Sequence, residues 1–497
     1  MTTRCYSGKA ALAQVQDRQF RENWRRLFEA CPWSTVHQRV EFADIWYSAY
    51  RAVFEPLLLT QEDESCGLTG LLALGRSRHT GELVPVGGGH SEYQVWLAEP
   101  SQSQQFIESA LDHLVRMFPG GRLTFLFAPP GTPLQLGPRW RRRCEVRHFR
   151  RGLLSTIDDA AIKAWLKKIA KKSKLNQLKQ LGSLTFRRVS DPDEAFKVLN
   201  EMEPFYDARQ LAISGIAPFH EDPNKAPFYR SLLQSGGLLH VTEMRLDGRL
   251  IAAHIGPINQ GQVILGMIAH SPFYAEYSVG TQHILMTAAL MSQEGLRALD
   301  LTPGGEYKDR FATMADEVYV LTFFFRDVDA IIYAFRRMAI ACLKHIVSTD
   351  RVKAALTALQ QKRALIRPVE IPGRLLRRIQ KWISHQSEFR IYRVPVSAAI
   401  PVGKRLCLRD SLDDLLHYEP SESWQPSRSA FIRTALERLA KGSHVYTMVL
   451  DGKLAHWGWL TEREDEAHLA EVRQTVPSWS PRSPITSWRY ISIWPSG

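Results

Sequence analysis

Four polar residues suited to group transfer lie in or just after one short apolar run, ALDLT, which ends at Thr302. Asp300 lies within the run, and Glu306, Tyr307 and Lys308 follow a PGG turn. A carboxylate can accept the proton of an attacking amine, and a phenol can protonate a leaving group. We therefore expect Asp300, Glu306 and Tyr307 to be catalytic and Lys308 to bind substrate. The structural alternative is that Glu306 caps a short helix and Tyr307 packs beneath it.

Two histidines add possible proton acceptors to this set. His254 lies in the β-rich run LIAAHIGPI, and His270 ends the run QVILGMIAH. An imidazole titrates close to neutral pH, so either side chain could take a proton from a substrate. We expect His254 to be the catalytic one, while a single histidine in such a run also fits a packed or surface position.

A loop that could bind an anion precedes a predicted helix over 281–294. The first amides of a helix are unpaired and carry partial positive charge, so they attract a pyrophosphate. Gly280 would let the backbone approach such a ligand, although a single glycine also fits an ordinary loop into a helix. The order of the surrounding elements favours the anion site. The expected cofactor-binding residues are Tyr277, Ser278, Val279, Gly280, Thr281 and Gln282.

The elements that must position these residues form a recognisable order. An amphipathic helix from Thr156 leads into the region, and apolar spacing and turn signals predict the rest. The Asp247-Gly248 pair is a strong signal for a tight hairpin. The order is β-α-α-β-β-β-α-β-α-β, with elements over 184–189, 193–209, 226–234, 238–246, 250–258, 262–270, 281–294, 298–302, about 304–311 and 318–325.

That order resembles the GNAT acyltransferase fold. The motifs KKSKLNQLKQLG, YDARQ, FYRSLL, DGRLIAAHIG and DLTPGGEYKDRF look like those of the CelD-like or BioF-like family of cellulose and exopolysaccharide gene clusters, which is related to the FemAB transferases. EYQVWLA extends the likeness towards the N-terminus. The resemblance implies a mixed sheet that opens between its fourth and fifth strands. It also implies acetyl-CoA or another acyl-CoA as the donor substrate, a small or saccharide-linked amine as the acceptor, and no metal.

Three further residues are expected to bind substrate. Arg209 and Gln210 end the predicted helix at YDARQ, and Lys174 lies on the basic entry helix, which abuts the acceptor side in related transferases. Each also fits a structural role, since an arginine at a helix C-terminus complements the dipole and a lysine run is usually a solvated face.

The fold class that these patterns predict is mixed α/β, with tandem GNAT-like lobes and a partial third GNAT-like unit. We expect a degenerate N-terminal lobe over 1–152, because its AEPSQSQQ has no glycine where a phosphate loop would be. The acetyltransferase domain is expected over 153–330 and a basic helical connector over 331–387. The third unit, over 388–497, contains VLDGKLAHWGW, which echoes RLDGRLIAAHIG, and ends in an irregular tail that fits either truncation or divergence.

Composition limits the setting and the partners. The 497 residues suggest two to four domains, and six cysteines without CxxC spacing favour a reducing compartment. The sequence shows no signal peptide or membrane span, so we expect a cytoplasmic protein. The net charge of +13 attracts anions but identifies no partner.

Two rival functions stay open. A FemAB-type transferase would take its acyl group from aminoacyl-tRNA, and no other nucleic acid is expected. A non-catalytic scaffold would instead contact an anionic membrane or a polysaccharide synthase through the basic helices, and such peripheral contact is also compatible with an enzyme. Hydrolase and NTPase motifs are not found in the sequence.

Overall fold

The computed structural model describes residues 3–64, 66–157, 172–346, 407–422, 425–461 and 490–493. The chain divides into two compact units, which are described separately. One unit consists of Met1–Arg326 with Leu406–Gly497, and the other is Asp327–Arg405. The start of the expected entry helix, at 158–171, lies outside the described residues.

The N-terminal lobe is built on a small antiparallel sheet. Its strand order is β1-β2-β3-β4, and β5 also pairs with β3. The strands are β1 (Arg4–Ser7), β2 (Phe54–Glu62), β3 (Leu68–Ser77), β4 (Leu83–Pro85) and β5 (Leu97–Ala98). The helices that contact them are α1 (Gly8–Gln16), α2 (Arg18–Ala30), α3 (Val40–Ala49) and α4 (Ser103–Met117). Only the last two residues of the EYQVWLA motif therefore lie in a strand.

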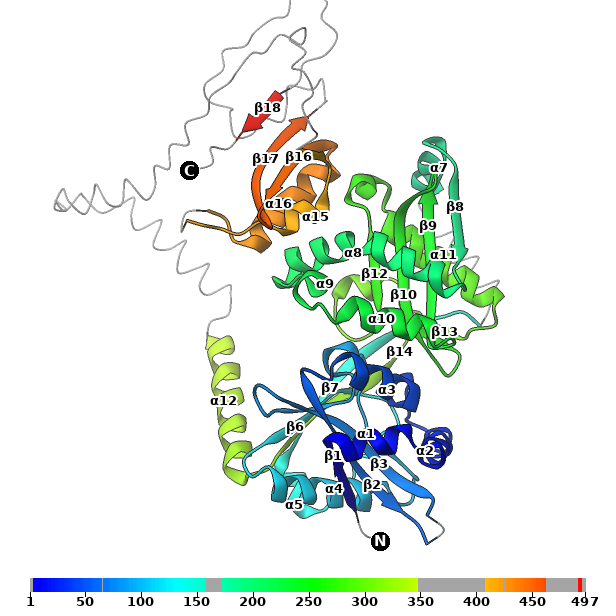
Figure 1. The fold of residues 1–497 in the computed structure, drawn as a ribbon, viewed down its shortest axis with the longest axis vertical. Helices are drawn as coiled ribbons and strands as arrows, with labels where there is room; N and C mark the ends of the chain where they lie inside the picture. The colour runs from blue at the N-terminus through cyan, green and yellow to red at the C-terminus, as the bar shows by residue number, and fades with distance from the viewer. Residues whose placement is uncertain are drawn as a thin grey trace, which may run out of the picture. The chain divides into compact units, whose positions relative to one another are not determined.

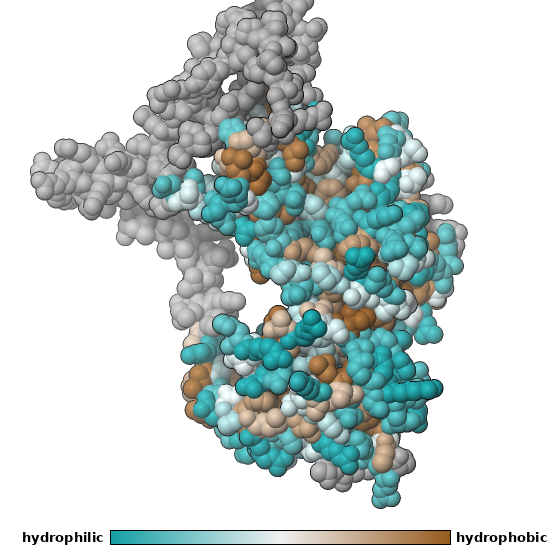
Figure 2. All heavy atoms as spheres, viewed as in Figure 1, coloured by the Kyte–Doolittle hydropathy of each residue, from teal (hydrophilic) through white to brown (hydrophobic). Residues whose placement is uncertain are grey.

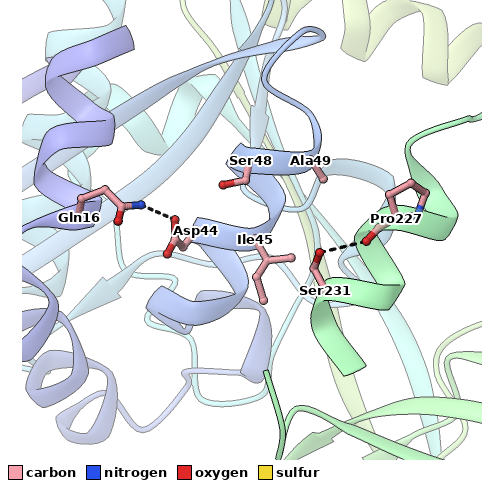
Figure 3. Close-up of a pocket in the computed structure, with 7 residues that line it drawn as sticks. All are labelled: Gln16, Asp44, Ile45, Ser48, Ala49, Pro227 and Ser231. Carbon is pink, nitrogen blue, oxygen red and sulfur yellow. Dashed lines mark hydrogen bonds between the residues drawn. The ribbon is translucent and has the colours of Figure 1, made fainter. Parts of the chain in front are cut away.

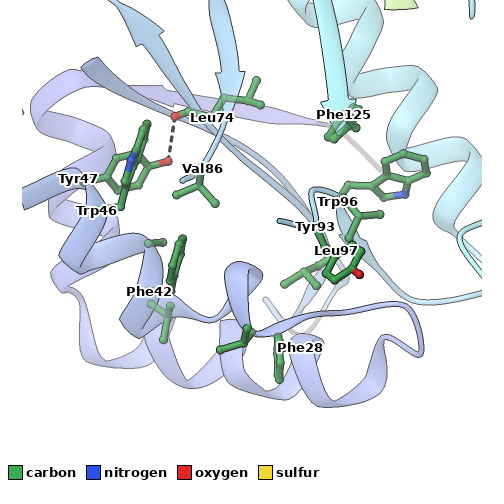
Figure 4. Packing of buried hydrophobic residues seen from close by; sticks show 14 of the residues in the cluster. Phe28, Phe42, Trp46, Tyr47, Leu74, Val86, Tyr93, Trp96, Leu97 and Phe125 are labelled. Carbon is green, nitrogen blue, oxygen red and sulfur yellow. Dashed lines mark hydrogen bonds between the residues drawn. The ribbon is translucent and has the colours of Figure 1, made fainter. Parts of the chain in front are cut away.

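Aromatic side chains fill the core of this lobe (Figure 4). Trp46 and Trp96 are at most 1% exposed, and Trp96 meets Phe125 edge to face at 5.6 Å. The hydroxyl of Tyr47 donates to the carbonyl of Leu74 at 2.9 Å, so its polar end is satisfied inside the core. These side chains belong to a buried cluster that continues into the central region, for example at Phe228 and Phe323.

The central elements follow the predicted order closely. The strands before the anion loop are β8 (Leu184–Arg188), β9 (Leu239–Leu246), β10 (Arg249–Asn259), β11 (Gln262–Ile264) and β12 (Met267–His270). The helices are α7 (Lys172–Gln180), α8 (Pro192–Ser214), α9 (Pro218–Glu221), α10 (Lys225–Gln234) and α11 (Val279–Gln293), with the 3-10 turns η3 (Pro272–Tyr277) and η4 (Glu306–Lys308). The last strands are β13 (Ala298–Asp300) and β14 (Met314–Phe324). Asp247 and Gly248 both have positive φ, as the predicted tight hairpin requires.

The two lobes exchange strands in one nine-stranded sheet, visible where β6, β7 and β14 meet in Figure 1. Its order is β6-β14-β7-β13-β11-β10-β9-β8, and β12 also pairs with β10. From the N-terminal part of the chain, β6 (Arg122–Ala128) pairs with β14, and β7 (Cys144–Ser155) lies between β14 and β13. The predicted boundary at 152/153 therefore falls inside a strand. The basic run at 139–151 forms α5 (Pro138–Arg143) and most of β7.

The sheet opens between β12 and β13, which belong to the fourth and fifth strands of the predicted central order. β11 pairs in parallel with β13, ending at the partners Ile264 and Asp300. Gly266 then takes a positive φ of 44°, and β12 continues in pairing with β10. This divergence is the feature that the GNAT resemblance predicted.

The C-terminal piece contains the hairpin expected from the internal echo. Its described elements are β15 (Leu408–Arg409), α15 (Leu412–Leu416), α16 (Arg428–Ala440), β16 (Ser443–Leu450), β17 (Lys453–Thr461) and β18 (Tyr490–Ile493). Asp451 and Gly452 again have positive φ. Helices α15 and α16 pack their apolar residues on the C-terminal half of α8. Residues 462–489, which hold the rest of the echo, lie outside the described residues.

The second unit is described only through α12 (Asp327–Ile346), where the basic connector was expected. The predicted bounds of the connector and of the third unit stay predictions.

Candidate active site

The N-terminus of α11 is open for an anionic ligand. The helix begins at Val279, and Ser278 before it is in the left-handed region without a side-chain cap. The first amides of an α-helix lack intrahelical partners, and they add to the positive end of the dipole. Val279 and Gln282 are buried, so these two residues can contribute to a ligand only through their backbone.

Two cations flank this helix end. Lys174 Nζ donates to the carbonyl of Glu276 at 2.5 Å and lies 3.4 Å from Ser278 Oγ. Arg310 Nη2 donates to Thr281 Oγ1 at 3.0 Å. Lys174 was expected to bind the acceptor, but the structure places it beside the anion loop. Sequence reasoning missed Arg310, because nothing in DLTPGGEYKDRF marks which of its charges folds back onto α11.

Gly280 is required by a close approach within the protein. A Cβ at this position would come within 2.9 Å of His270 Nδ1, so any side chain would displace the imidazole. His270 is the last residue of β12 and lies where the sheet opens. Burial lowers the pKa of His270 to about 4, and the positive charge of Arg209 adds to the effect. The imidazole is therefore neutral at neutral pH and can accept a proton.

Asp300 is an anchor inside the sheet. Its carboxylate is 1% exposed and accepts from Tyr93 Oη at 2.7 Å, from Arg151 Nη1 at 3.2 Å and from the amide of Thr302 at 2.8 Å. Arg151 also donates to Asp316 at 2.7 Å. Burial raises the pKa of Asp300, while Arg151 and Tyr93 oppose that rise. The catalytic role of Asp300 stays a prediction, which the enclosure and the three hydrogen bonds of this carboxylate disfavour.

The turn after β13 brings two of its three predicted residues towards α8. Tyr307 is 41% exposed, and the Arg209 guanidinium lies 6.0 Å from its ring centre. Lys308 Nζ donates to Thr302 Oγ1 at 2.6 Å. Burial lowers the pKa of Lys308, Asp300 opposes the shift, and Arg209 adds to it. The side chain of Glu306 lies outside the described residues.

His254 does not reach the opening. It is 1% exposed and lies in a row of buried imidazoles under α11 that includes His240 and His283. Burial lowers the pKa of His254 to about 3, so the ring stays neutral. Its catalytic role stays a prediction, which the enclosure of the side chain between sheet and helix disfavours.

The acceptor side centres on α8 and contains groups that the sequence did not single out. Tyr206 interacts with Gln210, and burial raises the pKa of Tyr206 to about 12. The carboxylate of Glu92 and the ammonium of Lys225 lie near this phenol. The structure therefore brings Arg209 and Gln210 together with Glu92 and Lys225. Only the EYQVWLA motif pointed to Glu92, and no spacing signal marked Lys225.

A separate hollow of about 500 Å³ lies at α3 and α10 (Figure 3). Within it, Gln16 donates to Asp44 at 2.7 Å and Ser231 donates to the carbonyl of Pro227 at 3.1 Å. None of the candidate residues lines it, so it plays no part in the site.

The described part of the chain contains neither a metal-ligand cluster nor a membrane-spanning helix. No group of three or more His, Cys, Asp or Glu side chains in the described part of the chain could hold a metal ion. Among the same residues, no helix is long and apolar enough to cross a membrane.

Residues 168–310 match the family model described as an acetyltransferase (GNAT) domain. The central region is a GNAT-type acetyltransferase domain. Together with the opened sheet, this match makes the chain an acyltransferase by class. No curated protein sequence matches the chain.

Several solved structures show distant likeness. FemX shares 9% identity at a TM-score of 0.43, with 61% of this chain and 96% of FemX covered. A tandem GNAT protein from the clavulanic acid biosynthesis pathway shares 12% at 0.37, covering 65% and 99%. L-PGS from Bacillus licheniformis shares 8% at 0.38, covering 63% and 94%. At these TM-scores the likenesses assign no substrate to this chain.

Proposed function

We propose that this protein is an acyl-CoA-dependent N-acyltransferase, most simply an acetyltransferase, that acts on an amine acceptor. The observation that carries the proposal is the divergence of β12 from β13 beside the open N-terminus of α11, which Lys174 and Arg310 flank. The pyrophosphate of coenzyme A would bind the amides of 278–281, and the thioester would lie at the end of β12.

The chemistry follows from the groups near that strand end. The acceptor nitrogen attacks the thioester carbonyl, so a C–N bond forms and the C–S bond breaks. Neutral His270 accepts the proton from nitrogen, and Tyr307 donates a proton to the departing thiolate. Glu306 remains a predicted proton acceptor. Asp300 and Arg151 fix the strand end from which this turn begins.

The resemblance to the CelD-like and BioF-like family supports a cytoplasmic role in polysaccharide or cell-envelope biosynthesis. The acceptor would then be a small or saccharide-linked amine. Peripheral contact with a membrane or a polysaccharide synthase belongs to the same proposal.

Calorimetric titration with acetyl-CoA, longer acyl-CoAs and free coenzyme A tests the donor. A ligand present at about a hundredfold its Kd should also stabilise the protein by about 2.7 kcal/mol. We expect acyl-CoA to bind. Absence of binding by every acyl-CoA, together with tight binding of aminoacyl-tRNA, would favour the FemAB-type transferase. Liposome binding without any thiol release would favour the scaffold.

His270→Gln, Tyr307→Phe and Glu306→Gln separate the catalytic roles. Each substitution preserves approximate size, and loss of a general acid or base costs about 10²-fold or more in rate. We expect His270→Gln and Tyr307→Phe to lower kcat with coenzyme A affinity retained. Wild-type turnover in both variants would refute these two assignments.

A further inference from the structure

We propose that Lys225, Arg209 and Lys308 form an acceptor subsite for an amine that also carries a carboxylate. Figure 1 shows α8 and α10, which supply the first two residues, in the same domain as β12. Lys308 comes from η4. The inference rests on the proposed acyltransferase function, and it adds the class of acceptor.

Lys225 is the main reason for expecting an anion. Its side chain is 8% exposed and is surrounded by the rings of Tyr206, Phe219 and Tyr229, whose centres lie 5.9, 5.2 and 5.7 Å from Nζ. It forms no salt bridge or hydrogen bond with any residue that the structure describes. Aromatic faces offset part of the cost of burying an ammonium, but an unpaired buried charge remains unfavourable. An anionic ligand would supply the missing partner.

The carboxylates nearest to Lys225 are engaged elsewhere. Asp207 accepts the backbone amides of Phe219 and His220, the latter at 2.7 Å. Asp222 accepts the Tyr50 hydroxyl at 2.7 Å. Burial lowers the pKa of Lys225, and Asp222, Asp207 and Glu92 oppose that shift from a distance. These groups favour the charged form of Lys225 without binding the ammonium directly.

Arg209 and Lys308 extend the positive region towards the sheet opening. Arg209 has no salt bridge within the described part of the chain, and its guanidinium lies over the ring of Tyr307. Its charge acts on His270 at the end of β12 and on Lys308. Two cations that repel each other favour an anion between them, and a guanidinium can bind a carboxylate through two hydrogen bonds.

Glu92 supplies the opposite charge for the acceptor's ammonium. Its Oε2 lies 2.8 Å from Nε2 of His37, and it interacts electrostatically with Lys225 and Lys308. Burial alone would raise the pKa of Glu92, but His37 and Lys225 lower it, so the group stays ionised. Three cations and one carboxylate match a molecule that carries both an acid group and an amine. An amine that lacks a carboxylate would leave the three cations without partners, so the site should bind such an amine more weakly.

Matched acceptor pairs test this directly. Thiol release from acetyl-CoA is measured with 4-aminobutyrate against 4-aminobutanamide, and with 2-amino-2-deoxyglucuronate against glucosamine. We expect kcat/KM to favour the carboxylate member of each pair by about tenfold or more, the usual effect of one lost charge-assisted contact. Equal rates within both pairs would overturn the proposal.

Variants locate the preference. Arg209→Met and Lys225→Met should lower the ratio of kcat/KM between the two members of each acceptor pair towards one. The change should appear in KM for the acceptor, while the Kd for coenzyme A stays unchanged. Lys225→Arg keeps the charge and should retain part of the preference. Lys197→Met removes an exposed charge from the same helix as Arg209 and should retain all of it. A preference that survives Arg209→Met and Lys225→Met would refute the assignment. If Lys225→Met does not fold, Arg209→Met and Lys308→Met decide the question.

A binding measurement covers the case in which no tested amine turns over. Saturation-transfer NMR is recorded on the complex with coenzyme A at about 10 mM amine. This amine concentration is about tenfold above the usual upper range of KM. The carboxylate members should bind and their neutral partners should not. If coenzyme A binds but no carboxylate amine does, the acceptor inference fails. If coenzyme A itself does not bind, the proposed function fails instead.

Discussion

The N-terminal lobe and the central domain use the same strand-to-helix unit in opposite ways. In the first, β5 leads into α4, which also begins without a side-chain cap but whose neighbours at that end are neutral or acidic. Trp96 Nε1 donates to Ser103 Oγ at 2.9 Å, and Gln102 Nε2 donates to the carboxylate of Glu99 at 3.1 Å. In the second, β12 leads into α11, where Lys174 and Arg310 leave a positive, uncapped helix end.

The difference teaches that local structure does not make an anion site. Both helices present the same orphan amides. Near the start of α4 the neighbouring side chains are neutral or carry a carboxylate, whereas α7 and the loop after η4 bring cations to the start of α11. Residues distant in sequence therefore decide which lobe binds a ligand.

The largest effect is expected from the residues that end β6 and β13. In the N-terminal lobe β6 ends on buried Ala128, whereas β13 ends on Asp300, which is paired with Arg151. Asp300→Ala leaves a buried guanidinium with one partner fewer and should cost about 3–5 kcal/mol of unfolding free energy in urea titrations. Asp309→Ala, which removes the exposed pair with Arg150, should cost at most about 1 kcal/mol.

A loss of turnover in Asp300→Ala without a loss of stability would contradict the anchoring role. It would return Asp300 to the catalytic candidates.

The next effect concerns the two helix starts. Reversing both cations, in Lys174→Glu with Arg310→Glu, should weaken coenzyme A binding about 100-fold, or about 2.7 kcal/mol, in calorimetry. The reference is Arg116→Glu, which reverses an exposed charge on α4 and should leave affinity unchanged. A similar loss in that variant would show that both lobes share the ligand or that only net charge matters.

Acid should loosen the central domain before the N-terminal lobe. Burial lowers the pKa of His254 to about 3 and of His270 to about 4, below the ordinary 6.5. Between each of these lowered pKa values and about pH 6.5, the unfolded chain therefore binds more protons than the folded chain. Stability is therefore complete above about pH 6.5 and falls as the pH drops towards 4, by about 1.4 kcal/mol per unit for each histidine.

Hydrogen exchange corrected for intrinsic rates checks this order. Amides of α11 should lose protection at pH 5 before those of α4, which packs through its own apolar side chains such as Phe106 and Leu111. His254→Leu should flatten the pH dependence of unfolding. Simultaneous loss in both helices would indicate that the strand exchange makes the lobes unfold as one.

The smallest effect should come from the C-terminal piece. Helix α16 contacts α8, where Arg433 donates to the carbonyl of Ala212 at 3.0 Å, and it also contacts η3 in the anion loop. A chain ending at residue 405 should bind coenzyme A about threefold more weakly, or about 0.65 kcal/mol. Unchanged affinity would mean that the loop is held by the central domain alone.

The two lobes also differ in what they contribute to the proposed acceptor side. The hydrophilic surface over α8, α9 and α10 belongs to the central domain (Figure 2). Yet Glu92 comes from the N-terminal part of the chain. The proposed acceptor subsite is thus the place where the N-terminal part of the chain contributes to the central domain.

The sequence by itself determined the features that depend on neighbours along the chain. The hairpin at Asp247-Gly248 and the order of the central strands follow from turn residues and apolar periodicity, which act over a few residues. The anion loop could be located for the same reason.

Only the tertiary structure decided the partners across long separations. The basic run at 139–151 forms most of β7, which inserts between β13 and β14, and Arg151 becomes the buried partner of Asp300. Lys225 and Glu92 carry no local pattern, and they meet only when α10 packs beside the N-terminal lobe. Burial and electrostatic pairing depend on the whole fold, so no window of sequence could assign these charges.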